Sequence, residues 1–79
     1  MHLKTAALQC KKVIKDNKHK WNTNNFDVSA EHCLDMCDKI IEGEVLREKG
    51  HRWLGWLQGC MCAFNVASLK ELKNINYES

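Results

Sequence analysis

The chain has 79 residues, with five cysteines, no proline and a formal net charge of +2 at pH 7. A chain of this length has room for one domain, which buries only about 60% of the surface that the unfolded form exposes. No apolar run approaches the ~20 residues of a membrane-spanning helix, and no signal peptide is apparent. With an odd number of cysteines, we expect a protein of the reducing cytoplasm, with free thiols and no membrane contact.

The charge is distributed unevenly along the chain. Residues 1–26 carry six lysines and one acid, whereas residues 27–48 carry seven acids and only Lys39 and Arg47 as cations. Two interpretations remain open. Either two oppositely charged helices lie side by side and screen each other, or the basic face binds an anionic partner.

The first element predicted is a helix from Leu3 to Asp16. Its apolar residues follow the i, i+3, i+4, i+7 spacing of one helical face. A basic face lies on another side and consists of Lys4, Lys11, Lys15 and Lys18. The asparagine-rich segment 17–25 favours a loop. We expect Trp21 and Phe26 to fold back from it onto the core.

A second helix is predicted from the N-cap Ser29 to Gly43, where glycine accepts the left-handed conformation of a helix end. A third is expected from Glu44 to Phe64, with Leu46 at the start of its apolar stripe. Ser68 and Glu71 form a capping box that opens a short C-terminal helix, and residues 76–79 are expected to fray. Strand-type alternation is missing, so the predicted fold is an all-α bundle of three main helices and a short fourth.

Four of the five cysteines fall on apolar stripes of the predicted helices, namely Cys10, Cys33, Cys37 and Cys60. Cysteine is among the most buried residue types, so we expect core thiols. The less favoured alternatives are a zinc site at Cys33 and Cys37 and a redox role. No catalytic motif, metal site or cofactor is predicted, and we expect a protein that is not an enzyme.

The third helix carries the most unusual surface. Gly55, Gly59 and Ala63 are spaced by four and make a strip without side-chain bulk, which lets another helix of the same or a second chain come close. Trp53 and Trp56 project from the same helix and give it more apolar surface than a domain of this size can bury in its core. These five residues are the predicted self-association surface of a homo-oligomer. Alternatively, both tryptophans simply fill the core.

Two further kinds of binding are considered. The polar residues of the third helix offer a surface for a ligand or partner, with Arg52 placed to stack on the ring of Trp56. The residues of this second predicted site are Lys49, His51, Arg52, Trp56 and Gln58. The basic face of the first helix offers phosphate contacts, although these alone give only non-specific nucleic-acid binding.

The segment Glu48–Gly59, followed by Val66–Lys73 and Asn76, resembles the C-terminal half of small accessory proteins encoded by tailed bacteriophages. This resemblance covers less than half of the chain. It implies a non-enzymatic protein in the cytoplasm of the infected cell that binds and modulates a host protein, such as a defence component. The lysines of the first helix and the acids of the second would then form the partner surface.

Arg52-Trp53-Leu54 and the later Gln58-Gly59 are also similar to a stretch of the small helical phage sponges that sequester cyclic oligonucleotides. This fainter resemblance implies an alternative function, an oligomeric sponge for a nucleotide signal. Its pocket would lie at a subunit boundary and be lined by Lys49, His51 or Arg52. The spacing differs from that of the sponges, and the arginine-rich segment after their helix is missing.

Overall fold

The computed structural model describes residues 2–79 and confirms the all-α prediction. It contains the helices α1 (Leu3–Asp16), α2 (Ala30–Ile41), α3 (Arg47–Ala63) and α4 (Leu69–Glu78), with two short 3₁₀ turns, η1 (Lys18–Lys20) and η2 (Phe26–Val28). No strand occurs in the described residues. None of the helices in this part of the chain is long and apolar enough to cross a membrane.

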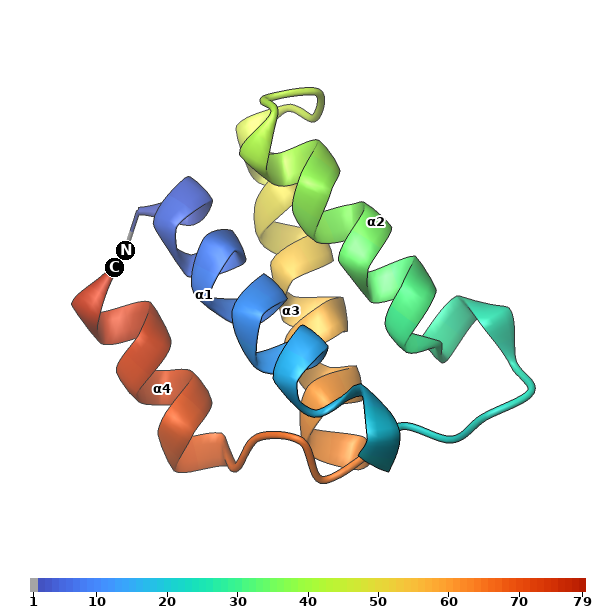
Figure 1. Ribbon diagram of the computed structural model, residues 1–79. Helices are drawn as coiled ribbons and strands as arrows, with labels where there is room; N and C mark the ends of the chain where they lie inside the picture. The colour runs from blue at the N-terminus through green and yellow to red at the C-terminus, as the bar shows by residue number, and fades with distance from the viewer. Residues whose placement is uncertain (1) are drawn as a thin grey trace.

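Helix α1 occupies the middle of the bundle. Figure 1 shows α2 on one side of it, α4 on the other, and α3 running behind. The two ends of the described chain meet, because the backbone N–H of His2 donates to the carbonyl of Ser79 at 2.6 Å. Helix α4 is therefore attached through the residue that follows it, Ser79, as well as through the loop that precedes it.

The helix-end signals in the sequence are confirmed by the structure. The hydroxyl of Ser29 accepts from the backbone N–H of His32 at 3.1 Å and caps α2. Gly43 has a φ of 73°, the left-handed conformation expected after this helix. At α4, Ser68 and Glu71 exchange both hydrogen bonds of the capping box. The backbone N–H of Ser68 donates to Glu71 Oε1 at 3.1 Å, and this hydrogen bond is the main reason why the pKa of that carboxyl lies below its ordinary value.

Four predictions about local structure are wrong. Helix α3 begins at Arg47, not at Glu44, because the chain leaves Gly43 in an extended path that ends at Leu46. Leu46 is 82% exposed and does not join the apolar stripe. Phe26 is also exposed, on the outer side of η2, whereas Trp21 does reach the core.

The C-terminal tail is the fourth case. Residues 76–78 continue α4 and do not fray, because the amide of Asn76 is paired with that of Gln58 in α3.

Trp21 illustrates how the loop before η2 is attached: its indole N–H donates to the carbonyl of Val28 at 2.8 Å. Its ring stacks on Phe64 with 5.4 Å between centroids.

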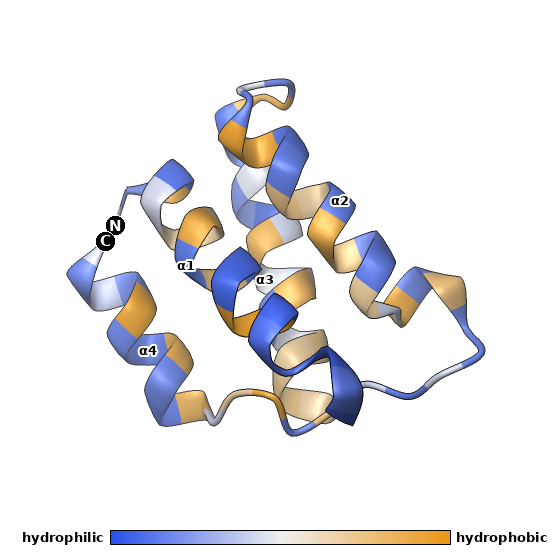
Figure 2. Cartoon of the chain, in the orientation of Figure 1, coloured by the Kyte–Doolittle hydropathy of each residue, from blue (hydrophilic) through white to orange (hydrophobic). Residues whose placement is uncertain are grey.

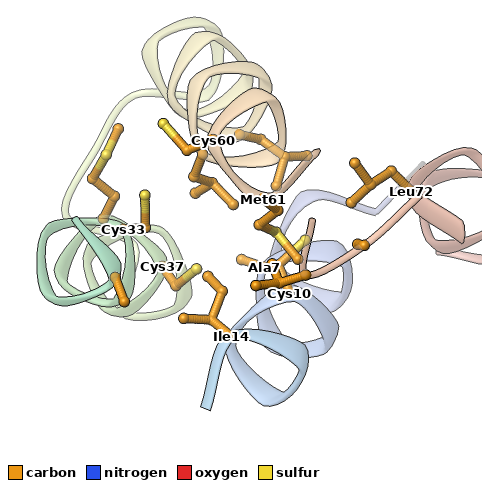
Figure 3. Close-up of a cluster of buried hydrophobic side chains, with 14 of the residues drawn as sticks. Ala7, Cys10, Ile14, Cys33, Cys37, Cys60, Met61 and Leu72 are labelled. Carbon is orange, nitrogen blue, oxygen red and sulfur yellow. The ribbon is translucent and has the colours of Figure 1, made fainter. Parts of the chain in front are cut away.

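The core lies between α1, α2 and α3, and the apolar faces of the helices turn toward it (Figure 2). Figure 3 shows Cys10, Cys33, Cys37 and Cys60 among its side chains, which confirms the prediction of core thiols. Burial raises the pKa of Cys33 and that of Cys37 to about 12. Across residues 2–79, no three His, Cys, Asp or Glu side chains are grouped to hold a metal ion.

Candidate interaction surfaces

The outer face of α3 is bare helix surface. Gly55, Gly59 and Ala63, here named the glycine strip, are all exposed. A Cβ atom added at Gly55 or Gly59 would meet nothing within 4 Å. Of the two helix partners that the sequence left open, a helix of the same chain does not pack on these glycines within the described residues. Of the partners that the spacing allows, a second chain remains.

Trp56 stands beside the glycine strip in a fixed position. Its side chain is 50% exposed, and its indole N–H donates to the backbone carbonyl of Asp27 in η2 at 3.3 Å. A large apolar ring that is half exposed and held by a hydrogen bond is suited to be an anchor for a partner. Trp53 is half-buried, and its ring is covered by the ammonium of Lys49, 5.2 Å from the centroid. The stacking predicted between Arg52 and Trp56 is not found, since Lys49 and Trp53 make the cation–π contact instead.

Two hollows flank the glycine strip. One, of about 280 Å³, lies beside Trp56 and η2 and has Val28, Cys60 and Phe64 in its walls. The other, of about 500 Å³, separates α3 from α4 and is walled by Leu69, which is 60% exposed. Gly59 and Ala63 line both hollows. The strip and the hollows together form one apolar trough, here named the α3 trough.

The predicted polar site on α3 is not assembled. Gln58, expected to present a polar tip at the surface, is only 8% exposed. Its amide donates to Asn76 Oδ1 at 2.7 Å and accepts from Asn76 Nδ2 at 3.0 Å, and it also donates to the thiol of Cys10 at 3.4 Å. A buried amide needs such partners, so the hydrogen bonds of Gln58 hold α3 and α4 together, although the residue also lines the larger hollow. Lys49, His51 and Arg52 line neither of the two hollows.

The basic face of α1 is partly neutralised by α2. Lys11 Nζ lies 2.6 Å from Asp38 Oδ1, and this hydrogen-bonded pair raises the pKa of Lys11. Lys18 Nζ lies 3.4 Å from Glu31 Oε1. The interpretation that two oppositely charged helices screen each other is thus confirmed for two of the four predicted lysines.

The remaining part of this face is open. Lys4 and Lys15 are exposed and form no salt bridge within the described residues; the same holds for Lys12, which was not predicted as part of the face. Leu8 lies among them on the helix and is 47% exposed. These four residues are named the lysine edge. Leu8 could have been found in the sequence, because it falls outside the apolar stripe of α1 and one turn from both Lys4 and Lys12.

Comparisons with protein-family models, with curated proteins and with solved structures found no match for this chain. Function is therefore inferred from the α3 trough, from the lysine edge and from the resemblance carried by Glu48–Gly59. Neither surface brings together a nucleophile, a base and a positioned acid.

Proposed function

We propose that the protein is a non-enzymatic accessory protein that forms a homo-oligomer through α3 and binds a host protein through the lysine edge. The observation that carries the host contact is the half-exposed Leu8 among three exposed lysines. Protein interfaces combine an apolar centre with a polar rim, and the lysine edge has this composition. The matching surface is a small apolar pocket bordered by carboxylates.

A protein partner fits this surface better than a nucleic acid does. Phosphate contacts require cations and gain nothing from an exposed leucine at their centre. Two lysines of the same face, Lys11 and Lys18, are already held by carboxylates of α2. Charge complementarity also raises the rate of association, so an acidic partner would bind faster at low salt.

The resemblance to accessory proteins of tailed bacteriophages supports the cellular setting. The proposed partner is accordingly a host protein in the cytoplasm of the infected cell, such as a defence component, whose activity is modulated by binding. A sponge for a nucleotide signal is less well supported. Lys49, His51 and Arg52 were expected to line its pocket, but none of them lines either hollow of the α3 trough.

Affinity capture from a nuclease-treated lysate of the bacterial host tests this proposal. The wild-type protein is compared with Lys12→Glu, which reverses a charge of the lysine edge, and with Lys70→Glu, which makes the same change on the exposed surface of α4. We expect a host protein that the wild type and Lys70→Glu retain and that Lys12→Glu loses. Equal capture by all three proteins, or capture only without nuclease, would contradict the proposed contact.

A further inference from the structure

We propose that the α3 trough is occupied by a second copy of this chain, with the two α3 helices antiparallel and each Trp56 seated in the other copy's hollow. The inference names the arrangement of the proposed homo-oligomer. It does not depend on the proposed host contact, which lies on α1. The two-fold axis would pass beside Gly59, which lies at the centre of the strip and, like Ala63, lines both hollows.

The glycine strip supplies the close approach. Glycine is disfavoured inside helices, and Gly55 and Gly59 lie in one exposed row where the described chain places nothing within 4 Å. Residues of this size at every fourth position allow two helices to approach until their backbones touch. Nothing in residues 2–79 uses that opportunity, so the row fits a helix from another molecule.

The positions of Trp56 and its hollow indicate which helix that is. Going round α3 from Gly59, Trp56 and Ala63 lie to the same side, where Val28 and Phe64 wall the smaller hollow. Trp56 lies three residues before Gly59, and Ala63 lies four residues after it. A two-fold axis that runs across the helix pair keeps a side chain on the same side of the pair and reverses its position along the helix. It therefore carries the Trp56 ring of one copy to the level of Ala63 in the other copy. The ring of one copy therefore faces the hollow of the other, and the surface is self-complementary.

The charges of α3 favour the antiparallel over the parallel pair. Lys49 and Arg52 project from the first half of the helix and are exposed. A parallel pair would bring the two copies of Arg52 against each other, because Arg52 lies close to the angular position of Gly59 on the helix. An antiparallel pair places the Arg52 of one copy near the C-terminal end of the other α3, where the helix dipole is negative.

Cysteine cross-linking tests the register of this pair. In a Cys62→Ser background, which removes the one exposed thiol, Gly59→Cys is compared with Gly55→Cys. Under mild oxidation we expect a disulfide-linked dimer from Gly59→Cys, because the two copies of residue 59 meet at the axis. The two copies of residue 55 would lie roughly 12 Å apart along the helices, too far for a disulfide, so this control should stay unlinked. Cross-linking of both variants alike would overturn the antiparallel register.

Sedimentation equilibrium tests whether the second copy is present at all. The wild type at micromolar concentration should have twice the 9.2 kDa mass of one chain. Gly59→Leu should have the mass of one chain and remain fully helical by circular dichroism, because a Cβ atom at this position meets nothing within 4 Å in the folded chain. A monomeric wild type, or a dimeric Gly59→Leu, would overturn the inference and leave the proposed host contact on α1 untouched.

Discussion

Asn76→Ala is predicted to destabilise the whole domain, although Asn76 lies only three residues from the end of the chain. The side chain forms a reciprocal amide pair with Gln58, with hydrogen bonds of 2.7 and 3.0 Å. The Gln58 amide is 8% exposed, so water does not readily replace the lost partner. The hydrogen bond that remains, from Gln58 Nε2 to Cys10 Sγ at 3.4 Å, is weak because sulfur is a poor acceptor. Without Asn76, Gln58 Oε1 has no donor.

The size of the effect follows from these contacts. A buried polar group without a partner costs about 1–3 kcal/mol, and we expect about 2 kcal/mol for Asn76→Ala. Domains of this length unfold with a free energy of roughly 4–12 kcal/mol, so the loss is a large share of the total. The melting temperature should fall by about 8–16 °C.

Urea unfolding monitored by circular dichroism measures the change. The informative control is Gln58→Leu combined with Asn76→Leu, which removes both polar groups and retains similar volume. Replacing both partners by apolar groups is expected to cost much less than removing one. If Asn76→Ala unfolds within about 0.5 kcal/mol of the wild type, or if the double variant loses more than the single one, the amide pair does not stabilise α4 as argued.

Three further predictions concern other parts of the chain. In the folded protein only Cys62 should react with a thiol reagent at pH 8, because burial raises the pKa of the other four thiols; more than one fast-reacting thiol would contradict this burial. Gly43→Ala should destabilise by about 1 kcal/mol because its φ is 73°, whereas Gly55→Ala should leave the monomer as stable or up to about 1 kcal/mol more stable; equal effects in urea unfolding would refute the difference. A hydrogen bond to Glu44 and repulsion from it raise the pKa of Glu42, so Glu44→Gln should lower that pKa in an NMR titration. A carboxyl whose pKa is raised in the folded state costs stability at neutral pH, where it is ionised, but not at low pH. The free energy of unfolding of Glu44→Gln should therefore exceed that of the wild type at neutral pH, and this difference should vanish as the pH falls below the pKa of Glu42. A difference independent of pH would contradict the coupling.

Much of the fold was predictable from the sequence because its signals are local. The apolar stripes of α1 and α2 and the capping residues Ser29, Gly43 and Ser68 lie within a few residues of the structure they determine. The start of α3 was missed because Leu46 matches the apolar spacing of the helix but follows the reversal at Gly43. Spacing alone does not reveal that such a residue belongs to the connection.

The pairing of Gln58 with Asn76 was not predictable in the same way. The two residues are 18 positions apart, and each reads as a surface residue of its own helix. Only the docking of α4 beside α1 buries both amides and makes them partners. The error about Gln58 and the error about the C-terminal tail therefore have one physical cause.

The openness of the α3 trough has a related explanation. The glycine spacing predicted a packing surface, but it did not reveal whether α4 would cover it. In the structure, α4 is held beside α1 and α3 by three attachments: the buried Leu72, the pair between Gln58 of α3 and Asn76, and the hydrogen bond from His2 to Ser79. These contacts keep α4 at the edge of the trough, where Leu69 forms a wall and leaves Gly55 and Gly59 bare. Loosening α4 by Asn76→Ala should consequently weaken the dimer as well as the fold, whereas Gly59→Leu should weaken the dimer alone.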